Sequence, residues 1–217
     1  MKRKFLLLSV VFLGVLSLTS SCQKTDVVAN TSVTSQIIDL PQEPLNADES
    51  GSLLLLREEE KLARDVYTAL YVKWGTSVFL NISSSEQQHT DAILTLLNKY
   101  GLKDPVGNNG PGVFTNPDLQ ILYTKLVSQG SVSVLDALKV GATIEDLDIF
   151  DLEKALLKSD NQDIKLVYDL LLQGSRNHMR SFYGQIIGLE STYSAQFITQ
   201  SELVAIVTSP NEKGRSW

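Results

Sequence analysis

From about residue 50 to the end of the chain, apolar residues recur at every third or fourth position. This is the period of an amphipathic helix, and no segment alternates apolar and polar residues long enough to indicate a strand. The pattern predicts long helices at 52–74, 83–100, 132–158 and 162–189, and shorter ones at 117–128 and after residue 199. The fold class is therefore expected to be all-α.

Local signals support these helix ends. Gly75 and Gly101 follow the last periodic residues of the first two helices, where glycine commonly ends a helix. Ser83 with Glu86 is the pattern of a capping box, and Thr199 with Glu202 repeats that pattern before the last short helix.

The connections between the long helices predict their arrangement. Those between the first and second and between the third and fourth are short, so each pair should be antiparallel. The connection between the second and third helices is about thirty residues long, enough to cross the length of a bundle. We expect an antiparallel four-helix bundle with one long crossover and additional short helices.

Composition limits the function. The chain has 217 residues and a formal net charge of -6, which argues against nucleic acid as the main partner. A single cysteine excludes an internal disulfide and a cysteine-based metal cluster. With only two histidines, any metal site has to draw mostly on carboxylates.

Polar residues interrupt the apolar stripe of each long helix. A stripe traced in steps of three and four residues should face the bundle interior. The interruptions, in chain order, are Glu60, Glu86, His89, Glu145, Asp148, Ser175 and His178, and Glu59 lies on the stripe next to that of Glu60.

Carboxylates on an inward face are costly unless positive charge neutralises them. None of the four stripes contains lysine or arginine. Glu86 and His89 lie three residues apart, so both can reach one ion. We predict a site for one or two ions held by Glu60, Glu86, His89, Glu145 and His178, with Glu59 and Asp148 as additional candidate ligands. Oxygen-rich sites with a few imidazoles suit iron or manganese.

Less specific interpretations remain open for several of these residues. A histidine on an apolar face is often a core residue, and the run Glu58–Glu60 taken alone is typical of a solvated helix face. Rotating the third helix to the stripe Leu135, Leu138, Ala142, Ile149, Leu152 and Leu156 would expose Glu145 and Asp148. Tyr67 and Tyr168 suit either core packing or hydrogen bonds to the carboxylates, and Ser175 suits packing.

These motifs resemble the ferritin-like superfamily. Glu60, Ala63, Arg64 and Tyr67 match the offsets of the first rubrerythrin helix, and 58–200 is similar to an uncharacterised ferritin-like family, domain of unknown function 2202. The resemblance implies a non-haem di-metal site. Ser175 departs from it, because ferritin-like enzymes usually have a bridging glutamate there; Asp148 is the residue that would compensate.

The first residues resemble a bacterial lipoprotein signal. Lys2, Arg3 and Lys4 precede an apolar run that ends in small residues before Cys22. We predict a signal peptide at 1–21, lipidation of Cys22, a flexible tether at 22–48, the bundle at 49–200 and a short helix and tail at 201–217. The expected location is the bacterial cell envelope, with the membrane as a partner through the lipid.

Two functions fit these observations. The first is a metalloprotein that binds iron or manganese and reduces oxygen or peroxide as an oxidase, peroxidase or ferroxidase. The second is a non-catalytic helical lipoprotein, an interaction or metal-sensing module whose polar groups form a metal-free network. The sequence leaves oligomerisation open.

Overall fold

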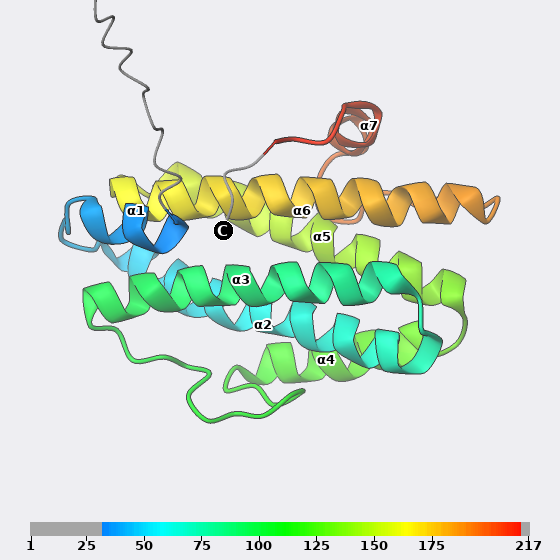
Figure 1. Ribbon diagram of the computed structural model, residues 1–217, viewed down its shortest axis with the longest axis horizontal. Helices are drawn as coiled ribbons and strands as arrows, with labels where there is room; N and C mark the ends of the chain where they lie inside the picture. The colour runs from blue at the N-terminus through cyan, green and yellow to red at the C-terminus, as the bar shows by residue number, and fades with distance from the viewer. Residues whose placement is uncertain (1–31, 214–217) are drawn as a thin grey trace, which may run out of the picture. The chain divides into compact units, whose positions relative to one another are not determined.

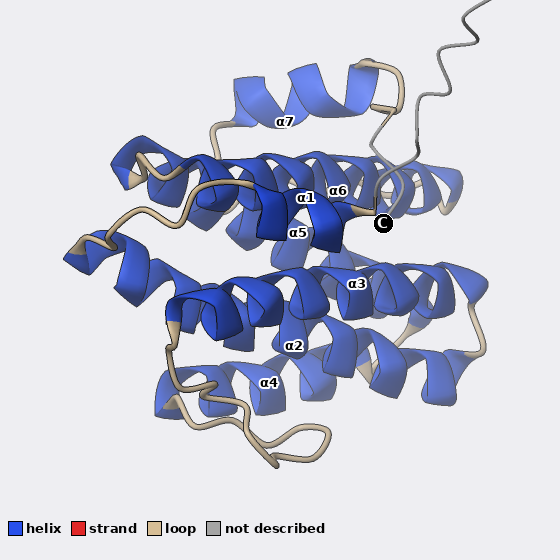
Figure 2. Ribbon diagram, turned by 60° about the vertical axis from the view of Figure 1, so that its left-hand side comes forward, coloured by secondary structure: helices blue, strands red, loops and turns tan. Residues whose placement is uncertain are grey.

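The structure, a computed structural model, describes residues 32–213, and these form helices without any strand (Figures 1 and 2). The expectation of an all-α fold is confirmed. The helices are α1 (Val33–Asp39), α2 (Ala47–Trp74), α3 (Ser77–Tyr100), α4 (Pro117–Gly130), α5 (Val134–Lys158), α6 (Gln162–Gly188) and α7 (Gln200–Thr208).

The four long helices α2, α3, α5 and α6 pack side by side. Contacts join α2 to α3, α5 to α6, α2 to α5 and α3 to α6. The short links at 75–76 and 159–161 make α2 and α3, and likewise α5 and α6, run in opposite directions (Figure 1). Buried apolar side chains from all four helices fill the space between them, which is where the predicted stripes point.

The connection between α3 and α5 spans residues 101–133 and contains α4. Figure 1 shows that α3 ends and α5 begins at opposite ends of the long helices, so this connection crosses their length. On the way, α4 packs against α2 and α5. The predicted crossover is present, and it places α4 over one side of α2.

Buried charges on α2 hold the crossover in place. The carboxylate of Glu58 accepts hydrogen bonds from the backbone N–H groups of Thr115 and Asn116, at 2.6 and 3.0 Å. Lys61 and Asp65 form an ion pair of 2.5 Å, and both side chains are almost completely buried. A carboxylate that accepts two backbone hydrogen bonds is stably buried, because the donors replace water.

Two helices begin earlier than the sequence indicates. Helix α2 begins at Ala47, where Asn46 and Glu49 form a capping box. Helix α3 begins at Ser77, so the predicted capping box of Ser83 with Glu86 is wrong. Ser83 lies inside α3, and its hydroxyl donates to the carbonyl of Leu80.

The cap of α7 agrees better with its pattern. Thr199 accepts a hydrogen bond from the backbone N–H of Glu202 at 3.2 Å. This is one of the two bonds of the predicted capping box.

Part of the expected tether is helical. Helix α1 lies within 22–48, buries Val33 and Ile37 and packs against α3 and α6. The ammonium group of Lys99 donates to the carbonyls of Ile37 and Leu40, which fixes the end of α1. Two apolar residues four positions apart are too few to show a sustained period. The predicted signal peptide 1–21 and lipidation at Cys22 lie outside the described residues.

Among residues 32–213, none of the helices combines the length and the apolar character needed to cross a bilayer.

We expect Glu58→Ala to lower the free energy of unfolding by about 1 to 3 kcal/mol, because two backbone N–H groups of the crossover lose a charged acceptor. Urea denaturation at neutral pH measures this change. Asp169→Ala is the control, since Asp169 is an exposed residue of α6. Equal stability of the two variants would contradict the proposed role of Glu58 in holding the crossover.

Candidate metal centre

All four long helices contribute to one buried cluster of acidic and imidazole side chains. Each member is at most 8% exposed. The cluster consists of Glu60 from α2, Glu86 and His89 from α3, Glu145 from α5 and His178 from α6. These are the five residues that the sequence predicts as ligands, and the structure brings them together.

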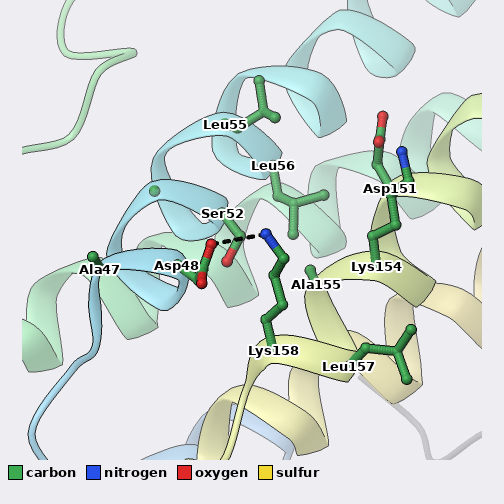
Figure 3. Close-up of a pocket in the computed structure, with 11 residues that line it drawn as sticks. Ala47, Asp48, Ser52, Leu55, Leu56, Asp151, Lys154, Ala155, Leu157 and Lys158 are labelled. Atoms are coloured by element: carbon green, nitrogen blue, oxygen red, sulfur yellow. Dashed lines mark hydrogen bonds and ion pairs between the residues drawn. The ribbon is translucent and has the colours of Figure 1, made fainter.

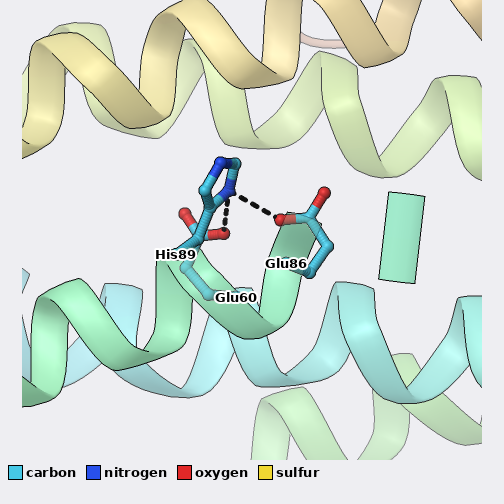
Figure 4. A group of neighbouring side chains, drawn as sticks. All are labelled: Glu60, Glu86 and His89. Carbon is cyan, nitrogen blue, oxygen red and sulfur yellow. Dashed lines mark hydrogen bonds and ion pairs between the residues drawn. The ribbon is translucent and has the colours of Figure 1, made fainter. Parts of the chain in front are cut away.

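The first ligand group is formed by Glu60, Glu86 and His89 (Figure 4). The Nδ1 atom of His89 lies 3.1 Å from Glu60 Oε2 and 2.8 Å from Glu86 Oε2. One potential ligand atom from each residue lies within 4.8 Å of the others. Glu86 and His89 face the same side of α3 because they are three residues apart, and Glu60 faces them from the adjacent α2.

The second ligand group is formed by Glu86, Glu145 and His178, again with ligand atoms within 4.8 Å of one another. The Nδ1 atom of His178 lies 2.8 Å from Glu86 Oε1 and 3.5 Å from Glu145 Oε2. The two imidazole rings are stacked, with centroids 5.6 Å apart. Glu86 therefore belongs to both groups and directs one oxygen to each histidine.

The pKa values of the cluster show how the charges depend on one another. Burial raises the pKa of Glu60 to about 7, against the opposing effect of His89. Burial would also raise the pKa of Glu86, but His89 and His178 together lower it well below its ordinary value. Burial works against protonation of His178, yet the charges of Glu86 and Glu145 raise its pKa to about 9. Without metal, protons on the imidazoles are the positive charge that keeps Glu86 ionised.

Several atoms of the cluster fit a cation. Glu86 Oε1, Glu145 Oε2 and His178 Nδ1 are buried, and the ion-pair contacts that these atoms make within residues 32–213 are with one another. In the same range, the ion pairs of the three glutamates are made with the two histidines and with no lysine or arginine. Buried charges of this kind are normally paired or bound to metal. Three carboxylates and two imidazoles are a donor set that iron and manganese accept.

The neighbouring residues differ from expectation in part. Tyr67 has both of the roles that its sequence position left open: its ring packs against Phe79 and Phe182, and its hydroxyl donates to Glu145 Oε1 at 2.6 Å. The interpretation of Tyr168 as a second such donor is wrong, because its hydroxyl pairs with Ser52 at 2.9 Å. Ser175 is buried and donates to the carbonyl of Leu171, which is a packing role.

The alternative interpretations of the acidic residues are also resolved. Glu58, Glu59 and Glu60 are all buried, so their run is not a solvated helix face. Glu145 and Asp148 are 0% and 4% exposed, which excludes the rotated third helix. Glu59 and Asp148 lie outside the two ligand groups.

Two residues of the site have no role in the sequence analysis. The hydroxyl oxygen of Ser85 lies 3.1 Å from His178 Nε2. The spacing of Ser85 in the sequence does not distinguish it from the other polar residues of α3. Gly174 of α6 provides room for His89, since a Cβ atom there would lie 2.7 Å from the ring atoms Cε1 and Nε2. A glycine inside a predicted helix is a weak signal of such close packing.

Comparison with known proteins gives a family. Residues 49–210 match the family described as an uncharacterized protein domain (DUF2202). This chain belongs to that family. It is 53% identical over 178 residues to the uncharacterized protein MJ0754 of Methanocaldococcus jannaschii, a match that covers 82% of this chain and 96% of the relative. The crystal structure of the hypothetical protein MJ0754 from Methanococcus jannaschii is similar to this structure with a TM-score of 0.78. The match covers 80% of this chain and 99% of the chain in that crystal structure.

We expect Gly174→Ala to displace the ring of His89, since a Cβ atom would overlap it, and to lower the manganese(II) content per chain below that of the wild type. Elemental analysis after equilibration with manganese(II) measures this content. Gly184→Ala is the matched control in α6, because a Cβ atom there meets nothing within 4 Å. The control should keep the wild-type manganese(II) content and gain up to about 1 kcal/mol from helix propensity. A manganese(II) content in Gly174→Ala equal to that of the wild type would contradict the assigned role of Gly174.

We expect the metal-free protein to lose stability as the pH rises from 6 to 9. The folded-state pKa values of Glu60 and His178, about 7 and about 9, lie above the ordinary values of 4.5 and 6.5. Groups shifted upward stabilise the fold below their unfolded pKa, and this contribution disappears as the pH passes the folded pKa. Glu86 has a lowered pKa and is ionised in both states over this range, so it adds no slope.

Urea denaturation of chelator-treated protein at four pH values measures this dependence. Excess manganese(II) should reduce or reverse the slope, because metal binding releases the protons of the imidazoles. A metal-free stability that rises from pH 6 to 9 would contradict this account of the cluster.

Proposed function

We propose that this chain is a ferritin-like metalloprotein of the bacterial cell envelope that binds two ions of iron or manganese and reduces oxygen or peroxide. The observation that carries the proposal is the pair of overlapping ligand groups, buried between four helices and sharing Glu86. Buried anions gathered without lysine or arginine are stable when a cation neutralises them.

The helix arrangement supports the ferritin-like assignment. In ferritin-like di-metal proteins, two helices each give a glutamate, each of the other two gives a Glu-x-x-His motif, and one connection is a long crossover. Here α2 and α5 give Glu60 and Glu145, and α3 gives Glu86-x-x-His89. Helix α6 gives His178 with Ser175 three residues before it.

The serine at position 175 shapes the chemistry that we propose. Each ligand group would offer an ion one glutamate of its own, one imidazole and the shared Glu86, which makes three protein ligands. Metal sites with three protein ligands keep positions open for a reactant. A second bridging glutamate at position 175 would take up coordination positions that Ser175 leaves to the oxidant.

The chain's own residues have defined roles in this proposal. Two iron(II) ions held by these residues would supply the two electrons that, with two protons, reduce one peroxide molecule to two water molecules. Glu86 sets the separation of the two ligand groups. Tyr67 donates to Glu145 and fixes the orientation of that carboxylate. The apolar core around the cluster keeps bulk water away from it.

The location is part of the proposal and rests on the sequence. Residues 2–4 are cationic, the following run is apolar, and Cys22 comes directly after small residues. A lipid on Cys22 would attach the protein to a membrane. Mass spectrometry of the peptide that begins at Cys22 tests the attachment, because a bound lipid adds its mass to this residue.

Metal binding by untagged protein tests the function. We expect two iron(II) or manganese(II) ions per chain in the wild type, one in His178→Ala and none in Glu86→Gln, since Glu86 serves both ligand groups. Gln88→Ala is the control, because Gln88 is an exposed residue of the same helix. The loaded wild type should consume hydrogen peroxide, followed by the loss of peroxide and by absorption of the oxidised iron.

Two results would contradict this function at different levels. Wild-type protein that binds no transition metal and gains no stability from iron(II) or manganese(II) would remove the metal centre and favour the non-catalytic module. Protein that binds two ions but consumes neither peroxide nor oxygen would remove the redox activity and keep the metal site.

A further inference from the structure

A second set of acidic side chains lies beside the two ligand groups. Glu59 of α2 and Asp148 of α5 are 6% and 4% exposed. Glu59 Oε2 and Asp148 Oδ2 are buried and make no hydrogen bond within residues 32–213. Neither residue belongs to the five ligands, so the metal centre alone does not explain why these two charges are buried.

Both acids line a small cavity between α2, α4 and α5. The cavity has a volume of about 30 Å³ and is otherwise lined mainly by leucines of these helices, with Leu119, Leu122 and Leu126 on α4. This volume holds one or two atoms of the size of water and no extended ligand. Two unpaired carboxylates in an apolar space of this size suit a single small cation.

Further acidic residues lie on α5 on both sides of Asp148. Asp151 lies one turn beyond Asp148 on α5 and is half-buried at the rim of the surface groove between α2 and α5 (Figure 3). In the other direction, Glu145 lies one turn before Asp148 and belongs to the metal centre. Residues at 145, 148 and 151 share one face of α5 and rise by about 4.5 Å at each step.

Neighbouring acidic groups raise the pKa values of Glu59 and Asp148. Burial, Asp151 and Glu60 raise the pKa of Glu59 to about 8. Burial raises the pKa of Asp148 well above its ordinary value, and Glu60, Glu145, Glu86 and Glu59 add to that effect. The raised pKa values show that these acids repel one another in their ionised forms when no cation is present.

Positive side chains do not relieve this repulsion. Within the described residues, Glu59, Asp148 and Asp151 form no ion pair with lysine or arginine at 4.0 Å or less. Burial raises the pKa of Asp151 and the charge of Lys154 only partly opposes this, since the Lys154 ammonium group lies 3.5 Å from the centre of the Phe150 ring. A purely structural role would favour a neutral side chain at positions 59 and 148, since burying unpaired charges lowers stability.

We propose that Glu59, Asp148 and Asp151 form a transit site through which divalent metal ions pass from the groove between α2 and α5 to the two ligand groups. The proposal rests on the metal-binding function proposed above. Asp151 attracts the hydrated ion at the groove. Glu59 and Asp148 replace part of its water in the cavity, and Glu60 and Glu145 then take it into the centre.

Kinetics of metal uptake test the transit site. Stopped-flow absorption follows cobalt(II) binding to metal-free wild type and to the double variant Glu59→Gln/Asp148→Asn. We expect the association rate to fall about tenfold or more, within the range over which local charge accelerates binding. The final stoichiometry should stay at two ions per chain, because the five ligands are intact.

Glu153→Gln is the matched control for the loss of charge. Glu153 is also on α5, but it interacts with Glu202 and Arg176 rather than with the metal centre. We expect this variant to bind cobalt(II) at the wild-type rate. The metal-free double variant should also be at least as stable to urea as the wild type, since amides replace buried unpaired carboxylates.

Each contrary result has a distinct meaning. An unchanged association rate in the double variant overturns the transit site and leaves the metal centre standing. A double variant that binds fewer than two cobalt(II) ions per chain shows that Asp148 or Glu59 is a ligand, and this result also overturns the transit site. A double variant less stable than the wild type without metal shows a structural role instead. Absence of cobalt(II) binding by the wild type overturns both the transit site and the proposed function.

Discussion

The structure depends on how three buried glutamates are neutralised. Glu60, Glu86 and Glu145 lie where the four long helices meet, out of reach of bulk water. Transferring an ionised carboxylate from water to such a place costs several kcal/mol unless opposite charge accompanies it. Two imidazoles are the opposite charge that the chain itself provides, and both are directed at Glu86. The centre therefore has more acidic groups than basic ones, an imbalance that the metal ion we propose would correct.

A second electrostatic system holds the outer parts of the fold, and it is balanced without metal. On the outer side of α2, Arg57 forms an ion pair with Asp104 of the crossover. Lys61 and Asp65 pair with each other within α2 and form hydrogen bonds to the backbone of Gly110 and Gly112 in the crossover. On α5, the carboxylate of Asp146 accepts a hydrogen bond from the hydroxyl of Tyr193 and others from backbone N–H groups of 196–198. Buried charge is thus fully paired where it supports structure. Incomplete pairing is concentrated at the cluster and at the cavity beside it.

Much of this could be predicted from the sequence, because helical periodicity carries most of the information. The four stripes identified the five clustered residues, since a step of three or four residues defines one face of a helix whatever it packs against. The interior position of Glu145 follows from the same stripe.

Other features depend on contacts between distant segments. Burial of Glu58 requires the crossover, whose loop has no period, so the run of three glutamates resembled a solvated face. The beginning of α3 was misplaced because Ser83 and Glu86 have the spacing of a capping box, although Phe79 and Ile82 already lie in the core. The position of Tyr168 in its stripe did not show that its hydroxyl would meet Ser52. The role of Gly174 depends on a ring from another helix, which no local pattern contains.

The three consecutive glutamates of α2 have a consequence for how this helix can change. Successive residues of a helix point about 100° apart. Glu58 therefore binds the crossover, Glu59 faces the small cavity, and Glu60 meets His89. A shift of α2 by a single residue would exchange these three destinations at once. The register of α2 is fixed from three sides, and an insertion or deletion within this turn would disrupt the loop, the cavity and the cluster together.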